Sequence, residues 1–166
     1  FKQTKDPKYA DKLQQAEAIM QASMEANTFA RSGGEDLYTI PVVVHVVWIT
    51  PVQNISDEQV MSQIDILNKD FQRLNTDTTE TPEGFKPVAG SLPIQFCLAQ
   101  RDPDGNPTTG IVRVETTVSS FSTDDDVKFN ASGGSDQWDP ERYFNIWVCN
   151  LTGGLLGYGE FPTAGF

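Results

Sequence analysis

His45 is the first side chain to examine for catalytic chemistry, because imidazole can act as a general base or as a metal ligand. It is the single histidine of the sequence and lies in a run of β-branched apolar residues, which predicts a buried strand. A serine–histidine–aspartate triad would have to use it, but neither Ser56 nor Ser62 lies in the context of a nucleophile elbow. We therefore interpret His45 as a hydrogen-bonded core residue.

The other side chains that could carry chemistry are two cysteines and a run of three aspartates. Cys97 and Cys149 fit no CxxC metal-binding pattern, and both fall in apolar segments where a thiolate is disfavoured. We interpret them as buried thiols, with a disulfide as the alternative. Asp124, Asp125 and Asp126 could suggest calcium, but no EF-hand ligand loop follows, which favours a solvated bend. No P-loop, GxGxxG or HExxH motif is present.

The charge of the chain argues against two classes of partner. Its 166 residues include 23 acidic and 12 basic side chains, which give a net charge of −11. Nucleic acids and anionic membranes attract basic surfaces, so neither is an expected partner. The length is sufficient for one domain with a substantial hydrophobic core.

The most apolar stretch, residues 40–49, predicts the central strand around which the other elements are arranged. Pro41 and Pro51 bound it, and it is shorter than the about 20 residues that a membrane helix requires. A continuously apolar strand predicts a sheet that is covered on both faces. Three further segments also have strand-like composition: 93–99, 110–114 and 143–151. Between the last two, we expect a long ordered loop over residues 115–142, because this stretch contains few large apolar side chains.

A helix is predicted over residues 56–74. Ser56 is a favourable N-cap, and Gln59 can complete a capping box with it. Apolar side chains then recur at helical spacing: Val60, Ile64, Leu67 and Phe71. We expect this helix to lie across the sheet with that stripe inward.

A second helix is predicted near the N-terminus, over residues 7–29, followed by a polar linker at 31–36. The linker begins with Arg31 and Ser32 ahead of two glycines, a composition that fits an exposed proteolytic site and an ordinary linker equally well.

Four segments together resemble the pappalysin family of metzincin zinc metallopeptidases, in particular its ulilysin-like members. They are IPVVVHVVW (40–48), ISDEQVMSQIDILNKDFQRLN (55–75), LPIQFCLAQRDPDGNPTTGIVR (92–113) and ERYFNIWVCNLTGGLLGYGEFP (141–162). The segments have the same order as in the family and cover most of residues 37–162. The resemblance implies an α/β (α+β) fold: a twisted mixed sheet with a packed helix, which is the upper, N-terminal subdomain of a zincin.

The resemblance also implies a division of the chain. Residues 1–36 would be a propeptide-like helix and linker, with Arg31 and Ser32 as the maturation site, and residues 37–166 would be the N-terminal subdomain of the catalytic domain. In the family, a helix with the sequence HExxHxxGxxH comes next and binds zinc. That helix is absent here, so the zinc ligands are expected in a C-terminal part that would be a partner of this chain.

The function implied by the resemblance is that of a secreted zinc endopeptidase, made as a zymogen, which hydrolyses peptide bonds with zinc-activated water. This chain would supply the scaffold and an edge strand, in which Leu156, Gly157 and Tyr158 contact protein or peptide substrates through their backbone groups. A structural edge strand without substrate contact is the alternative for that segment. The resemblance leaves calcium dependence open. The rival function is a non-catalytic secreted binding or adhesion module, and a purely structural role is a third.

Overall fold

The computed structural model describes residues 37–159 and seven residues nearer the N-terminus. The seven are helical and lie within the predicted helix at 7–29: Asp11, Gln14, Gln15, Glu17, Ala18, Gln21 and Ala22. The rest of that predicted helix and the linker with Arg31 and Ser32 lie outside the described residues. The chain divides into two compact units, of which the larger, Glu35–Leu156, contains every described strand and the helix α2. The predicted division at residues 36 and 37 stays a prediction.

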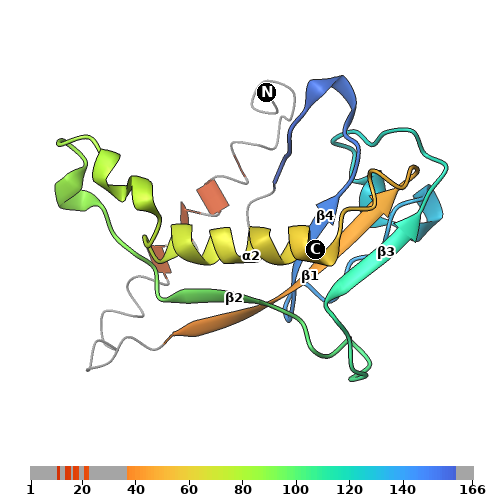
Figure 1. The fold of residues 1–166 in the computed structure, drawn as a ribbon, viewed down its shortest axis with the longest axis horizontal. Coiled ribbons are helices and arrows are strands. Elements are labelled where there is room, and N and C mark those ends of the chain that lie inside the picture. The colour runs from red at the N-terminus through yellow and green to blue at the C-terminus, as the bar shows by residue number, and fades with distance from the viewer. Residues whose placement is uncertain (1–10, 12–13, 16, 19–20, 23–36, 160–166) are drawn as a thin grey trace. The chain divides into compact units, whose positions relative to one another are not determined.

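Strand β1 pairs with all three of the other described strands (Figure 1). The strands are β1 (Tyr38–Trp48), β2 (Ile94–Leu98), β3 (Ile111–Glu115) and β4 (Phe144–Val148). The first half of β1 pairs with β2 and its second half with β3, while β4 pairs with its middle. Because Val44–Val46 pair with both β3 and β4, these two strands take opposite edges of β1.

Strands β2 and β3 lie end to end along the same edge of β1. The Ala99 N–H donates to the Val42 carbonyl at 2.8 Å, and two residues on, the Val44 N–H donates to the Gly110 carbonyl at 2.8 Å. Residues two apart in a strand bond toward the same side, so the chain leaves this edge after Ala99 and returns to it at Gly110. Gly110 has a φ of +73°, and a Cβ there would lie 2.7 Å from the Ala99 nitrogen. The return therefore requires glycine.

Side chains of β1 are buried on both faces of the sheet. On one face, Val42, Val44 and Val46 form a core with Val60 and Ile64 of α2. On the other, the odd-numbered side chains of β1 are covered largely by the β3–β4 segment, defined as residues 116–143. The continuous apolar composition of β1 follows from this double coverage, as predicted.

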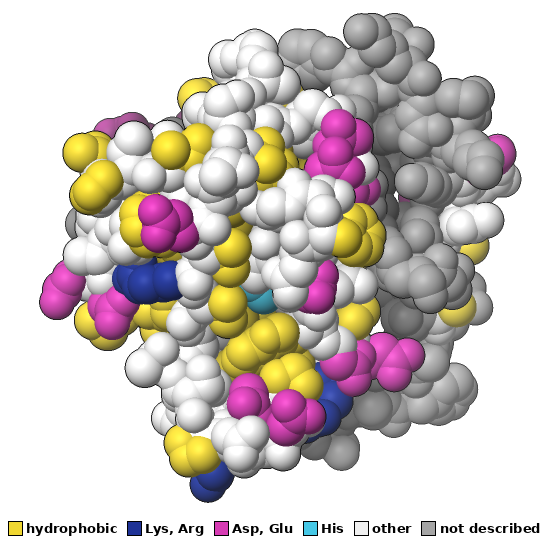
Figure 2. Space-filling model, turned by 90° about the vertical axis from the view of Figure 1, so that its right-hand side faces the viewer, with side chains coloured by type: hydrophobic (Ala, Val, Ile, Leu, Met, Phe, Trp, Pro, Cys, Tyr) yellow, Lys and Arg dark blue, Asp and Glu magenta, His cyan; other side chains and the backbone are white. Residues whose placement is uncertain are grey.

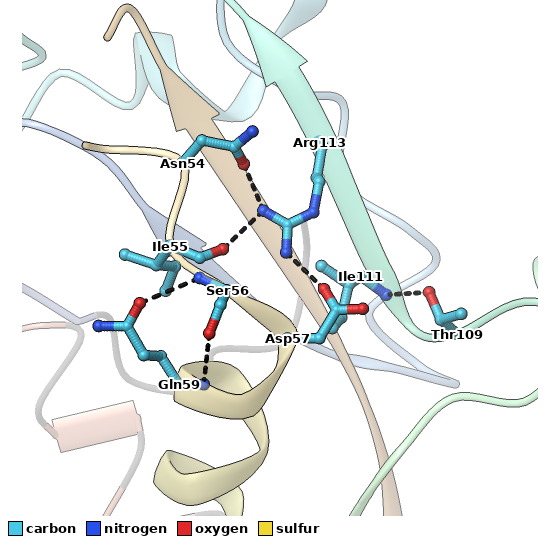
Figure 3. Close-up of polar contacts among 8 residues, drawn as sticks. All are labelled: Asn54, Ile55, Ser56, Asp57, Gln59, Thr109, Ile111 and Arg113. Carbon is cyan, nitrogen blue, oxygen red and sulfur yellow. Dashed lines mark hydrogen bonds and ion pairs between the residues drawn. The ribbon is translucent and has the colours of Figure 1, made fainter. Parts of the chain in front are cut away.

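Helix α2 (Asp57–Phe71) begins as the sequence predicts. The Gln59 N–H donates to the Ser56 hydroxyl at 3.3 Å, and the Ser56 N–H donates to Gln59 Oε1 at 3.0 Å, which completes the capping box (Figure 3). Short 3-10 helices occupy the connections: η2 (Thr76–Glu80), η3 (Lys86–Val88), η4 (Asp126–Lys128), η5 (Asn130–Ser132) and η6 (Thr152–Gly154).

Arg113 of β3 ties the start of α2 to the sheet. Figure 3 shows its guanidinium pointing at the turn before the helix, where it donates to the Asn54 side chain and, at 2.7 Å, to the Ile55 carbonyl. The same guanidinium forms an ion pair with Asp57, in the first turn of the helix. The three contacts come from both terminal nitrogens of one planar guanidinium, so they fix the orientation of the helix start better than a single charge pair would.

The far half of α2 closes the outer edge of β2. The Asn68 side chain donates to the Phe96 carbonyl at 2.9 Å and accepts from the Phe96 N–H at 2.7 Å. Gln72 donates to the Ile94 carbonyl at 3.0 Å. Helix side chains thus take the place of a neighbouring strand and protect an edge that would otherwise be open to pairing.

The predicted fold class, a sheet with one packed helix, is confirmed, and two details differ. All pairings of the four described strands are parallel, whereas a mixed sheet was expected. The strands are joined by long crossovers, which parallel pairing requires. The predicted edge strand also differs, because Leu155–Gly159 are in no strand. Gly153 and Gly154, at φ +69° and +72°, form a turn before this segment, and Gly157 and Gly159 lower its strand propensity.

The Asn68 contacts lead to a first prediction. Replacing Asn68 with alanine leaves the N–H and C=O of Phe96 without their partner, so we expect the free energy of unfolding to fall by about 1–3 kcal/mol. Urea denaturation of the wild type and N68A measures this. Asp65→Ala, on the exposed surface of the same helix, is the matched control and is expected to change stability by less than about 0.5 kcal/mol. Equal stability of wild type and N68A would contradict the role given to Asn68.

Candidate functional site

His45 lies in the core with both ring nitrogens hydrogen-bonded. Its side chain has no exposed surface; Nδ1 lies 2.8 Å from the Ser135 hydroxyl and Nε2 lies 3.0 Å from Asn145 Oδ1. The Asn145 amide nitrogen donates to the carbonyls of Trp138, at 2.9 Å, and Tyr143, at 3.1 Å. This fixes Oδ1 as the acceptor, so His45 carries its proton on Nε2 and accepts from Ser135 at Nδ1.

The surroundings of His45 keep the ring neutral. Trp147 stacks on it with ring centroids 4.9 Å apart, and Trp138 meets it edge-on at 6.4 Å. Burial lowers the pKa of His45 below its ordinary value, and the hydrogen bond to Asn145 opposes that shift without reversing it.

The Ser135–His45–Asn145 chain has the order of a catalytic triad but cannot act as one. The Ser135 hydroxyl is as inaccessible as the histidine, since only 2% of the residue is exposed. A neutral amide also stabilises an imidazolium far less than a carboxylate does. The interpretation of His45 as a core residue is confirmed. Ser135 and Asn145 were not identified from the sequence, where the only signal is a polar residue, Asn145, inside an apolar strand pattern.

The other sequence candidates form no reactive centre in the described part of the chain. Cys97 and Cys149 are free thiols and half-buried, and burial raises the pKa of Cys149, which disfavours its thiolate. Asp125 pairs with Lys128 at 2.9 Å. No group of three or more histidine, cysteine or acidic side chains is placed to hold a metal within residues 37–159. His45, with both nitrogens engaged, does not fit a zinc site either.

Leu156, Gly157 and Tyr158 follow η6 in a stretch without regular structure. The Leu156 side chain is fully exposed, and Tyr158 is half-buried. A Cβ built on Gly157 meets no atom within 4 Å. The contact of these three residues with substrate stays a prediction.

The chain just before these residues is held by the β3–β4 segment. The Phe121 N–H donates to the Asn150 carbonyl at 2.9 Å, and the Phe121 carbonyl accepts from the Thr152 N–H at 2.8 Å. The Asn150 side chain adds a bond to the Ser119 carbonyl at 2.8 Å. The position of residues 150–152 therefore depends on that of the β3–β4 segment.

The net charge of −11 predicts a surface with more acidic than basic side chains. Figure 2 shows carboxylates and hydrophobic side chains interspersed on one face, with few lysines or arginines. None of the helices in the described ranges has the length and apolar character needed to cross a membrane.

A second prediction concerns Asn145. Alanine at this position removes the acceptor for His45 and for the Trp138 N–H, together with two donated bonds, so we expect unfolding to become easier by about 2–4 kcal/mol. Chemical denaturation followed by tryptophan fluorescence measures it. Asn106→Ala removes an exposed side chain bonded to Asp102 at 3.2 Å and is the control. A loss no larger than that of the control would show that the network contributes little.

Solved structures of mirolysin are similar to this chain. Mirolysin in complex with compound 9 is 53% identical over 74% of this chain and 46% of that chain, with a TM-score of 0.71. Mature mirolysin of Tannerella forsythia in complex with a cleaved peptide is 51% identical over 76% of this chain and 47% of that one, with a TM-score of 0.74. A promirolysin mutant of Tannerella forsythia is 40% identical over 86% and 48%, with a TM-score of 0.67.

The chain thus spans about half the length of the mirolysin structures that it matches. No protein-family model matches it, and no curated protein sequence does. The similarity rests on sequence identity and on the same arrangement of a sheet with one packed helix. The described part of this chain therefore has the fold of the upper subdomain of a mirolysin-like metzincin.

Proposed function

We propose that this chain is the N-terminal part of a secreted zinc metalloendopeptidase of the pappalysin family. The observation that carries the proposal is the identity of 51–53% to mirolysin structures over about three quarters of the chain. In this proposal the four strands and α2 are the scaffold, and Leu156, Gly157 and Tyr158 bind an extended protein or peptide substrate through backbone groups.

Zinc would be the cofactor, held by residues beyond this chain. The described residues supply no ligand set, and the chain covers less than half of each matched mirolysin chain. When bound, zinc supplies an activated water for peptide hydrolysis. The remaining part of the enzyme is therefore the partner that this scaffold requires. Calcium binding stays an open expectation.

The proposal also takes residues 1–36 as part of a zymogen pro-segment. A match to promirolysin over 86% of 166 residues covers about 143 residues, whereas residues 37–166 number 130, so the match extends into residues 1–36. The match to mature mirolysin, 76% or about 126 residues, fits within residues 37–166. This difference supports a pro-segment at the N-terminus. From the sequence, the proposal places the maturation cleavage between Arg31 and Ser32.

A non-catalytic secreted binding or adhesion module is the second candidate. Within residues 37–159, the buried His45 and the lack of a metal-holding cluster favour it. The two candidates differ in the sequence expected after Phe166: a peptidase requires an HExxH helix there, whereas a module does not.

A third prediction separates them. Extending the reading frame past Phe166 is expected to reveal HExxHxxGxxH, and the longer protein is expected to hydrolyse peptides and to lose that activity when zinc is chelated. Mass spectrometry of the matured enzyme should place its N-terminus at Ser32. A stop codon at Phe166, or a longer protein without zinc and without peptidase activity, would decide for the module.

A fourth prediction tests substrate binding by the backbone of Gly157. In the longer enzyme, Gly157→Pro removes an N–H that an extended substrate would use, so we expect kcat/KM to fall by about tenfold or more. Gly157→Ala keeps the N–H, and its Cβ meets no atom within 4 Å, so it is the matched control and should retain activity. Equal activity of the two variants would assign the segment a structural role only.

A further inference from the structure

We propose that the Ser135–His45–Asn145 hydrogen-bond chain is an acid-sensitive latch that holds the β3–β4 segment against the sheet. The latch itself does not depend on the proposed function. Its three residues come from the β3–β4 segment, from β1 and from β4, so the chain of bonds joins the segment to two strands at once.

Hydrogen bonds attach residues 135–138 of the β3–β4 segment to β1 and β4. Besides the bond from Ser135 to His45, the Trp147 indole N–H donates to the Ser135 carbonyl at 2.9 Å. Asn145 holds Trp138 by both backbone groups, at 2.8 and 2.9 Å. Within the segment, Gly134 packs so closely on Val127 that a Cβ there would lie 2.1 Å from the Val127 carbonyl oxygen, which ties residues 134–138 to the rest of the segment. We therefore expect these contacts with the sheet to be lost together when the segment opens.

Protonation of His45 is unfavourable in this position. Asn145 Oδ1 already accepts the Nε2 proton, so an added proton goes to Nδ1, and the Ser135 hydroxyl must turn from donor into acceptor. The new charge is also buried without a carboxylate partner, which is costly. Val112 of β3 pairs with His45 and is apolar, and β4 presents the uncharged Asn145 and Trp147.

The charged groups of the β3–β4 segment do not compensate this charge. Lys128 lies 5.9 Å from the centre of the Trp147 ring, on which His45 stacks, and forms an ion pair with Asp125. Asp136, next to Ser135, accepts instead from the backbone and side chain of Asn130, at 2.7 and 2.8 Å. Tyr143, which meets the Trp138 ring edge-on, donates to the Arg101 carbonyl at 3.1 Å, and the Arg142 guanidinium lies 5.5 Å from the centre of the Tyr143 ring. The Cys149 thiol lies in the apolar cluster of Trp147, and burial raises its pKa.

The direction of the pH effect follows from linkage. His45 is harder to protonate while buried, and its pKa lies below the value of about 6.5 that it regains when exposed. Above about pH 6.5 both states are neutral and the latch is fully closed. As the pH falls below that value the opened state binds a proton first, so the opening equilibrium rises by up to about tenfold per pH unit until the buried ring also protonates.

Opening has a consequence for the candidate substrate segment, and this step rests on the proposed function. Phe121, in the β3–β4 segment, bonds to Asn150 and Thr152, just before Leu156. Release of the β3–β4 segment is therefore expected to loosen residues 150–152, which lead into the candidate substrate residues Leu156, Gly157 and Tyr158. This is expected in mildly acidic solution, while the α2 face of the sheet stays folded.

Hydrogen exchange of this chain between pH 7.5 and 5.0, corrected for the intrinsic rate, is the first measurement. We expect amides of residues 116–143 and 150–152 to lose protection by up to tenfold per pH unit below about 6.5, while those of α2 keep theirs. His45 is the only histidine, so its imidazole resonances report its titration without ambiguity. Unchanged protection of residues 116–143, or equal loss in α2, would overturn a local latch. So would protection that persists after His45 has titrated.

Variants assign the effect to His45. His45→Gln cannot be protonated in this range and is expected to make the protection independent of pH. Asp136→Asn removes the neighbouring carboxylate and is expected to behave as the wild type does. A pH effect that persists in H45Q, or that disappears in D136N, overturns the assignment. If H45Q does not fold, the wild type decides the question: the loss of protection must begin near pH 6.5 and level off at the pH at which the buried imidazole titrates, and a loss over another pH range overturns the assignment.

Discussion

The structure depends on one constraint: the middle of β1, Val42–Val46, is bonded along both edges and buried on both faces. A strand in this position must find partners for all its N–H and C=O groups, because water cannot reach them. β2 and β3 supply them along one edge and β4 along the other. All three strands run parallel to β1, so the chain must return to an edge of β1 in the same direction before each of them. The crossovers before β2 and β4 place α2 and the β3–β4 segment on opposite faces of the sheet.

The two faces of β1 are covered by different kinds of contact. The face under α2 is apolar, with Val42, Val44 and Val46 against the helix stripe. The opposite face contains a buried imidazole, which is tolerated because both of its nitrogens are bonded. No buried side-chain nitrogen or oxygen atom within the described residues lacks a partner. A proton can therefore alter the attachment of the β3–β4 segment, whereas the apolar face has no group that responds to mild acid.

Within the described residues, polar side chains hold the scaffold together and form no reactive centre. Polar side chains of this part of the chain serve mainly to fix elements to one another: Arg113 at the start of α2, Asn68 along β2, and Asn145 between β4 and the β3–β4 segment. Each of these side chains is hydrogen-bonded to neighbouring residues, and these bonds serve the structure. This use is consistent with a subdomain that positions a substrate segment while other residues carry out the reaction.

Much of the fold was readable from local patterns, and the hydrogen-bond network around His45 was not. The apolar run of β1, the Ser56–Gln59 capping box and the stripe of α2 are signals within a few residues, and they determined the strands and the helix. The partners of His45 lie 90 and 100 residues away, and no local pattern encodes such a distance. The sequence by itself determined that His45 would be buried; only the tertiary structure decided that Ser135 and Asn145 would bond to it, because crossovers bring the three together at β1.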